Sequence, residues 1–319
     1  MSLLTDVLLV VAGGGALWYG AERFVESAVA LARRFGLSDV VTGVVVVGIG
    51  TSAPEVAVSA DAALTGVPDI AVGNVVGSNF FNLGLILGSV ALLGRVRVRG
   101  QLLRRDGVTL LLATIAVLGL LADRRLGRLE AALLLVGLAA YLVVLLRRSS
   151  RTTPIASGED AEAGPEERPG LVALGLLGGL ALVLLGADVL VRGASALAID
   201  AGVSEWAVGV TVVAAGTSSP ELAAAIAAAR QGRPGLSAGN VVGSSTFNLL
   251  AVLGVAGLIE PLSVAPNAPG SLVWLTGLVV LVLVLFRSGH VLTRIEGALL
   301  VIVALARWAI DLFGVPRVL

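Results

Sequence analysis

The sequence predicts an all-α polytopic membrane protein with ten transmembrane helices, arranged as two inverted-topology repeats of five helices each. Of its 319 residues, 57% are hydrophobic and 14% charged, and the mean hydropathy is +0.99. Soluble domains carry about 25% charged residues. Apolar runs of the ~20 residues needed to cross a bilayer follow one another along nearly the whole chain. In addition, the second half of the chain repeats the first.

Short polar connections separate the ten predicted spans. The spans cover residues 4–32, 38–64, 69–93, 106–122, 128–147, 169–198, 203–230, 235–259, 270–287 and 292–314. A longer polar segment, residues 148–168, is rich in Pro, Ser and Glu and too short to fold alone, so we interpret it as a flexible linker. The predicted domains are therefore a first five-helix repeat over residues 1–147, the linker, and a second five-helix repeat over residues 169–319.

An internal duplication relates the two halves. Residues 20–88 align without a gap to residues 186–254 at a constant offset of 166, with 34 identities over 69 positions. Such a match indicates a repeat architecture. Because each copy contains five spans, an odd number, the second copy enters the membrane from the side opposite to the first. In transporters, repeats of this kind meet near the bilayer midplane and build the substrate site there.

The arginines predict the orientation in the membrane, because short cytoplasmic connections are enriched in them. With the N-terminus outside, the outer side holds four: Arg124, Arg125, Arg128 and Arg317. The inner side then holds fifteen: Arg33, Arg34, Arg95, Arg97, Arg99, Arg104, Arg105, Arg147, Arg148, Arg151, Arg168, Arg230, Arg233, Arg287 and Arg294. We therefore expect an integral protein of the plasma membrane with both termini outside and the linker in the cytoplasm.

Several function classes are excluded by composition. Acidic and basic residues balance at 22 each, so no excess charge indicates a nucleic-acid partner. The absence of cysteine excludes disulfides and thiolate metal sites. The sequence contains no nucleophile–base pair, phosphate loop or cofactor motif, so we expect neither an enzyme nor a bound cofactor.

Equivalent acidic motifs lie in the middle of the second and seventh spans. Residues 50–55 read GTSAPE and residues 216–221 read GTSSPE, which places Glu55 and Glu221 at bilayer depth. A carboxylate there costs about 2.5–3.5 kcal/mol on insertion scales and therefore indicates a functional site. The glycine and proline loosen the helix and free backbone carbonyls. Hydroxyl, carbonyl and carboxylate oxygens are hard ligands that suit Na⁺ or Ca²⁺ better than Zn²⁺ or copper.

A second pair of motifs lies in the third and eighth spans. Residues 73–82 read GNVVGSNFFN and residues 239–248 read GNVVGSSTFN. Ser78 and Asn82 are four residues apart, a spacing that places them on the same face of a helix. This face can be directed toward the glutamates. Ser244 and Asn248 repeat this spacing.

Structural interpretations of the same residues stay open. Small and hydroxyl residues commonly mediate helix packing in lipid. That interpretation applies equally well, taken singly, to Ser52, Ser78, Ser218 and Ser244. A buried carboxylate bonded to a neighbouring helix is the weaker interpretation of the two glutamates, because they occupy equivalent positions. We interpret Asn74 and Asn240 as capping the broken helix by bonding to its backbone rather than as ion ligands.

The paired GTS-x-PE and GN-V-x-GS-x-x-x-N motifs resemble the alpha repeats of the sodium/calcium exchangers, within the calcium:cation antiporter superfamily. Both motifs occur in the right order in both halves, over residues 43–88 and 209–254, and the whole length of the chain fits. The resemblance implies that Glu55 and Glu221 are the central acidic ligands, shared by Ca²⁺ and Na⁺. The further ligands it implies are Thr51, Ser52, Ser78, Asn82, Thr217, Ser218, Ser244 and Asn248, with the carbonyls of Gly48 and Ala214.

The resemblance also implies an activity: a monomeric antiporter that exchanges Na⁺ for Ca²⁺ by alternating access, extrudes Ca²⁺ and moves net charge. Residues 4–32 and 169–198 would be the long helices that slide against the rest of the protein. Some members, including potassium-dependent ones, have aspartate at the position of Asn248, so we do not expect potassium dependence here. Two alternatives stay open. One is a Ca²⁺/H⁺ antiporter with the same fold and site, and the other is a channel that passes ions without a counter-ion.

Overall fold

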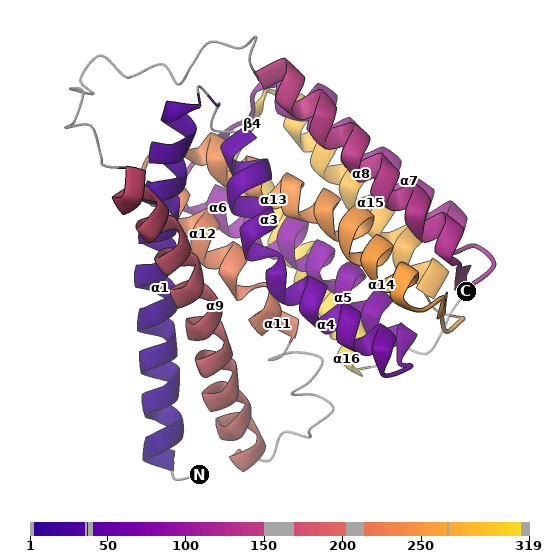
Figure 1. The fold of residues 1–319 in the computed structure, drawn as a ribbon, viewed down its shortest axis with the longest axis horizontal. Coiled ribbons are helices and arrows are strands. Elements are labelled where there is room, and N and C mark those ends of the chain that lie inside the picture. The colour runs from indigo at the N-terminus through magenta and orange to yellow at the C-terminus, as the bar shows by residue number, and fades with distance from the viewer. Residues whose placement is uncertain are drawn as a thin grey trace.

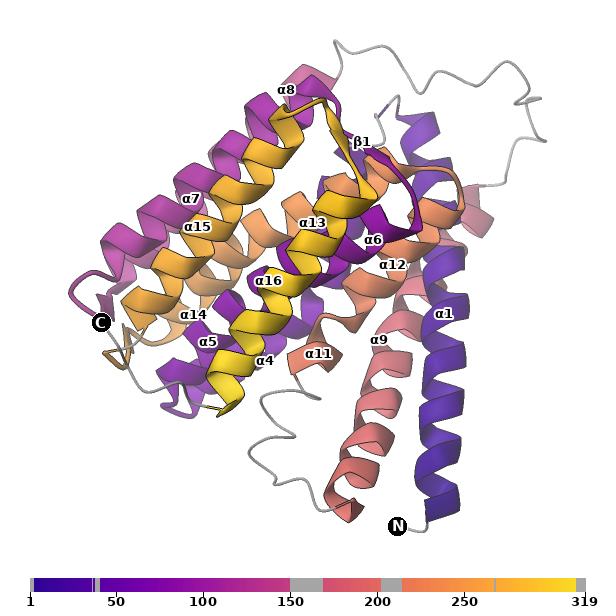
Figure 2. The same ribbon diagram turned by 180° about the vertical axis from the view of Figure 1, so that it is seen from behind.

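The computed structural model describes residues 3–35, 37, 41–149, 169–201, 214–266 and 268–313. Within these residues the helices form ten segments that correspond to the ten predicted spans (Figures 1 and 2). Six are long and apolar enough to cross a membrane as single helices, or seven if one bent pair counts as a span. Part of the seventh predicted span, residues 203–213, lies outside the described residues.

Many of the segments contain π-helical turns, labelled η, or breaks. The first half comprises α1 (Leu3–Arg34), η1 (Thr42–Val47), α3 (Gly48–Thr51), α4 (Ala53–Leu64), α5 (Pro68–Phe80), η2 (Phe81–Ile86), α6 (Leu87–Leu93), η3 (Leu102–Gly107), α7 (Val108–Leu120) and α8 (Arg128–Ser149). The second half comprises α9 (Pro169–Asp200), α11 (Ala214–Thr217), α12 (Ser219–Arg230), α13 (Pro234–Phe247), η5 (Asn248–Val252), α14 (Leu253–Ile259), α15 (Ala268–Arg287) and α16 (Arg294–Phe313).

The longest helices, α1 and α9, form an antiparallel pair that extends past the rest of the molecule at the end marked N (Figure 1). Four glycines let their backbones touch. A Cβ on Gly13 would lie 2.8 Å from the Gly186 carbonyl oxygen, and one on Gly20 would lie 2.9 Å from that of Gly179. The offset of 166 exchanges the two contacts, because it relates Gly13 to Gly179 and Gly20 to Gly186. The antiparallel pairing of these equivalent helices is the arrangement that inverted repeats require.

Two short β-ribbons tie connections of the two halves together. β1 (Val96–Arg97) pairs with β4 (Val291–Leu292), and β2 (Arg125–Leu126) pairs with β3 (Leu262–Ser263), both antiparallel. The offset of 166 relates β1 to β3 and β2 to β4, so the ribbons are equivalent. Paired connections must lie on the same side of the membrane, and the predicted ten-span alternation places each pair on one side.

The central helices of each half are the most buried. In the spans formed by α5 with α6 and by α13 with α14, 78% of the residues in the most apolar 18-residue stretch are buried. The corresponding value for α8 is 22%. The protein interior is thus built from the helices that carry the GN-V-x-GS-x-x-x-N motifs. This arrangement matches the predicted fold class and buries the motif side chains Ser78, Asn82, Ser244 and Asn248.

Candidate cation site

The helices that carry the glutamates are broken at equivalent serines. The chain leaves helical geometry at Ser52 (φ −81°, ψ 10°) between α3 and α4, and at Ser218 (φ −93°, ψ 6°) between α11 and α12. Pro54 and Pro220 follow in the first turn of the next helix, where a missing N–H breaks no helical hydrogen bond. The break bends the first of these spans by 46°. Each glutamate then lies in the first turn of a helix, where the helix dipole favours negative charge.

The glutamate of each repeat accepts a hydrogen bond from a serine of the other repeat. The Ser52 hydroxyl donates to Glu221 Oε1 at 3.0 Å, and the Ser218 hydroxyl donates to Glu55 Oε1 at 3.1 Å. All four side chains have 0% exposure. The offset of 166 exchanges the two hydrogen bonds, so the glutamates form one composite site on the pseudo-symmetry axis between the repeats.

The motifs of α5 and α13 close around this site. Ser78 lies beside the Glu55 carboxylate, and the Ser244 hydroxyl donates to the Gly48 carbonyl at 3.2 Å. Asn82 lies in η2 and Asn248 begins η5, so both amides belong to π-helical turns. Such turns often mark functional positions. The sequence predicted that Ser78 and Asn82 share one face of a helix. It did not predict that the α-helix changes to a π-helical turn between these two residues.

The site contains buried polar atoms that no group in the described part of the chain satisfies. Glu55 Oε2, Glu221 Oε2 and the oxygen and nitrogen of the Asn82 and Asn248 amides are buried without a hydrogen-bond partner among the described residues. Neither glutamate takes part in an ion pair between described residues. Burying unpaired carboxylates is expensive, and cations relieve that cost. No group of three or more His, Cys, Asp or Glu side chains gathers in the described part of the chain, so neutral oxygens must supply the rest of any coordination shell.

The remaining predicted ligands lie close by in the fold. Thr51 ends α3 beside the Glu221 carboxylate, and its hydroxyl donates to the Val47 carbonyl at 3.0 Å. Thr217 ends α11, and Ala214 begins that helix. The roles of these residues as ion ligands stay predictions.

Asn74 and Asn240 bond to the broken helices, as interpreted from the sequence. The Asn74 amide donates to the Glu55 carbonyl at 3.2 Å and to the Ser59 hydroxyl at 2.9 Å. The Asn240 amide donates to the Glu221 carbonyl at 3.4 Å. Sequence reasoning missed Ser59 because the duplication replaces it with Ala225 in the second repeat. The sequence feature that could have identified Ser59 is its position one turn after Glu55 on the same helix.

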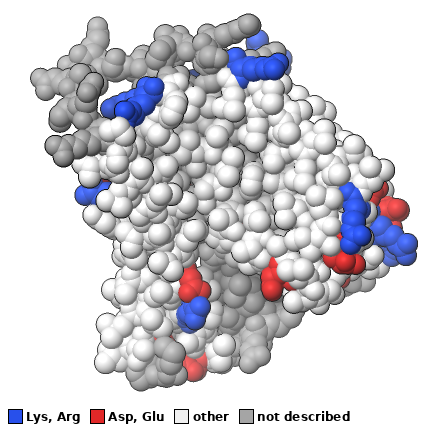
Figure 3. Space-filling view, in the orientation of Figure 1, with Lys and Arg blue, Asp and Glu red and all other residues white. Residues whose placement is uncertain are grey.

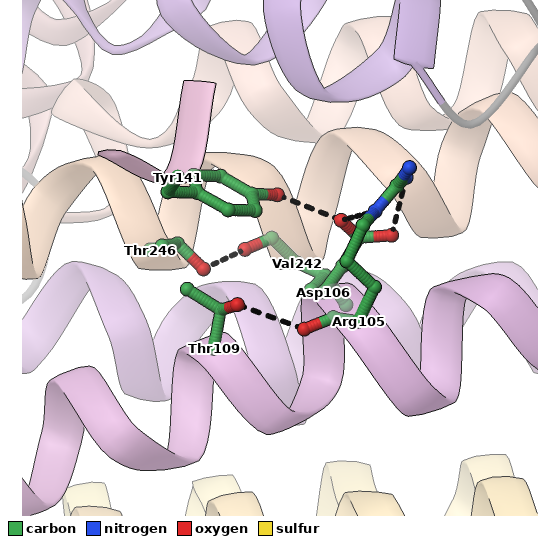
Figure 4. A network of polar contacts seen from close by, with 6 residues as sticks. All are labelled: Arg105, Asp106, Thr109, Tyr141, Val242 and Thr246. Atoms are coloured by element: carbon green, nitrogen blue, oxygen red, sulfur yellow. Dashed lines mark hydrogen bonds and ion pairs between the residues drawn. The ribbon is translucent and has the colours of Figure 1, made fainter. Parts of the chain in front are cut away.

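A second buried polar network contains neither glutamate (Figure 4). Arg105 and Asp106 form an ion pair at 2.8 Å, and the Tyr141 hydroxyl donates to Asp106 Oδ1 at 3.0 Å. Both Asp106 oxygens are therefore paired, in contrast to those of Glu55 and Glu221. We interpret this network as a structural link between η3 and α8.

Comparison with known proteins identifies the family. The family model of the sodium/calcium exchanger protein matches residues 5–147 and 171–307. The chain belongs to the sodium/calcium exchanger family. The sodium/calcium exchanger MaX1 of Methanosarcina acetivorans is 32% identical over 338 residues, covering 93% of this chain and 96% of that protein. The inner membrane protein YrbG of Escherichia coli is 37% identical over 271 residues, covering 83% of each.

Among solved structures, the sodium-calcium exchanger NCX_Mj soaked with 10 mM Na⁺ and 10 mM Sr²⁺ superimposes with a TM-score of 0.84. That match has 29% sequence identity and covers 98% of this chain and 100% of the other. The predicted resemblance and the predicted fold class are thus confirmed. The protein is an integral membrane cation/calcium exchanger of the sodium/calcium exchanger family, a secondary transporter and not an enzyme.

Proposed function

We propose that this exchanger couples Na⁺ to Ca²⁺ by alternating access at the site between Glu55 and Glu221. The supporting observation is the set of buried oxygens on these glutamates and on Asn82 and Asn248 that have no partner among the residues the structure describes. Two ionised carboxylates give the empty site a charge of −2, which one Ca²⁺ balances. Flexible shells of carboxylate, amide, hydroxyl and carbonyl oxygens suit Ca²⁺ better than the strictly octahedral Mg²⁺.

The shared carboxylates make the transport an antiport. Two Na⁺ neutralise the same two glutamates, so Na⁺ and Ca²⁺ exclude each other and cross in opposite directions. Enclosing the empty, doubly charged site in the membrane is costly, so the conformational change requires bound ions. A third Na⁺ on neutral oxygens would make each cycle move one net charge, a contribution of about 2.3 kcal/mol per 100 mV.

For the placement of the protein, we propose the plasma membrane, with both termini outside and the monomer as the working unit. The support for the orientation is the excess of arginines in the inner connections. The central glutamates and their serine partners all come from one chain, so the proposed site needs no second copy.

Proteoliposomes distinguish sodium coupling from proton coupling. We expect vesicles loaded with Na⁺ and diluted into sodium-free buffer to take up radioactive Ca²⁺, and an inside-positive potential to accelerate this uptake because net positive charge leaves. Choline-loaded vesicles with an imposed pH gradient provide the control. Uptake driven only by the pH gradient would establish the Ca²⁺/H⁺ alternative, and uptake that needs no counter-ion would indicate a channel.

The reciprocal serines give a graded prediction for the same assay. Ser52→Ala and Ser218→Ala each remove one hydrogen bond to a buried carboxylate, a loss of about 1.5–3 kcal/mol. We expect each variant to lower the apparent Ca²⁺ affinity about tenfold or more, and to similar extents because the two hydrogen bonds are equivalent. Ser288→Ala, which changes an exposed hydroxyl at the end of α15, is the control. Unchanged affinity in both site variants would leave these serines with a packing role only.

A further inference from the structure

An apolar groove of about 460 Å³ lies between α7 and α8 on the membrane-facing surface. Leu112 and Leu133 at its edge are 61% and 55% exposed, so it opens sideways toward lipid. Thr109 contributes the one polar side chain of the lining, and its hydroxyl already donates to the Arg105 carbonyl at 2.8 Å. The groove therefore offers a polar ligand no free partner.

The groove exists because the first repeat has small residues where the second has large ones. At the offset of 166, Ala113 corresponds to Val279, Ala116 to Val282, Gly119 to Leu285 and Gly137 to Val303. A Cβ on Gly119 would meet nothing within 4 Å, and one on Gly137 would make only ordinary contact with Leu250 at 3.8 Å. At these four positions the first repeat thus presents smaller side chains than the second, and they contribute to the open space of the groove.

The length of the groove matches one leaflet. Its lining runs along α7 from Thr109 to Leu120, about 16 Å at 1.5 Å per residue. The hydrocarbon core of a bilayer is about 30 Å thick, so this length is close to half of it. One end of the groove lies at the connection between α7 and α8, and the other lies at Thr109, one turn from Arg105.

Two arginines stand at the connection between α7 and α8. Arg124 and Arg125 are exposed, and neither takes part in an ion pair between described residues. Of the neighbouring acids, Asp123 accepts a hydrogen bond from the Arg125 backbone at 3.0 Å through Oδ1, and Glu260 pairs with Arg128 at 3.7 Å. Figure 3 shows blue and red side chains together at this edge of the molecule.

We propose that the groove binds a membrane phospholipid, with one acyl chain between α7 and α8 and the phosphate on Arg124 and Arg125. Guanidinium groups bind phosphate oxygens with paired, charge-assisted hydrogen bonds. The apolar lining binds the chain, and its length accepts the chain of a single leaflet. Leu250 in the lining belongs to the same π-helical turn as Asn248, so the lipid packs against the back of the candidate cation site.

Because the chain has no cysteine, a single fluorophore can report on the groove. A label on Leu112→Cys at the rim is titrated with a brominated phospholipid in detergent micelles. We expect quenching that saturates at low lipid-to-protein ratio. A label on Gly277→Cys, at an exposed position of α15, should instead be quenched in proportion to the lipid added. Proportional quenching at both positions would overturn the proposal.

Filling the groove with the residues of the second repeat should remove the saturable quenching. The variant is Gly119→Leu with Gly137→Val, and Gly277→Leu is the matched control. The double variant Arg124→Ala with Arg125→Ala should weaken the saturable binding about tenfold without altering the groove. This second variant keeps the proposal testable if the filled variant does not fold. Saturable binding that persists in the filled variant would refute the acyl-chain site. Equal binding of a brominated detergent without phosphate would refute the role of the arginines.

Discussion

Replacing Glu55 or Glu221 with glutamine is expected to abolish calcium exchange, with Na⁺-driven Ca²⁺ uptake falling about 100-fold or more. Glutamine keeps the size and shape of glutamate but removes one of the two buried charges that balance Ca²⁺. A loss of about 2.8 kcal/mol in ion binding corresponds to this factor, and breaking a buried charge pair typically costs 3–5 kcal/mol. Initial rates in Na⁺-loaded proteoliposomes measure the effect directly.

The control for both variants is Glu260→Gln, because the Glu260 side chain is 60% exposed and pairs with Arg128 at the surface. That variant should transport like the unmodified protein. The two site variants should fail to the same degree, because each glutamate accepts a hydrogen bond from the serine of the other repeat. Near-normal uptake in either variant would remove that glutamate from the centre of the site.

The fold followed from the sequence because its main signals are local or repetitive. A run of apolar residues identifies a span without knowledge of its neighbours, and the constant offset relates the halves position by position. The same offset relates positions with positive φ: Arg124 (67°) and His290 (54°), and Gly66 (73°) and Gly232 (72°). The odd number of spans in each copy then dictates inversion.

Features that depend on contact between distant segments could not be predicted in this way. The two-residue strands β1 to β4 are too short to show an alternating pattern, and they exist because Val96 meets Leu292 and Leu126 meets Leu262. The π-helical turns η1, η2 and η5 insert extra residues into largely apolar runs whose composition does not change. Pro54 and Pro220 indicated the breaks, but only the structure placed them at Ser52 and Ser218.

For the candidate site, the sequence supplied the residues but not their pairing. Equivalence under the offset shows that Ser52 matches Ser218; it does not show that each bonds to the glutamate of the opposite repeat. This reciprocal hydrogen bonding depends on the breaks of the two helices facing each other across the site. Asn74 was easier to interpret, because an amide in the neighbouring helix of the same repeat can reach the freed backbone carbonyl of Glu55.

Gly20→Val is expected to force α1 and α9 apart. A Cβ at this position would lie 2.7 Å from Leu182 Cβ, 2.8 Å from the Val183 nitrogen and 2.9 Å from the Gly179 oxygen. Backbone atoms cannot rotate away as a side chain can, so the variant must lose helix contact over several turns. Overpacking of this kind costs about 1–3 kcal/mol, and we expect the Tm of the purified protein to fall by about 2–5 °C.

Gly15→Val on the same helix is the matched control, because Gly15 is exposed and a Cβ there meets nothing within 4 Å. Gly179→Val should reproduce the effect of Gly20→Val, since the same contact is then overfilled from α9, where a Cβ would lie 3.0 Å from the Gly20 oxygen. Equal Tm values for Gly15→Val and Gly20→Val would show that the two helices do not touch there. A selective loss in Gly20→Val and Gly179→Val would establish that α1 and α9 depend on direct backbone contact at this crossing.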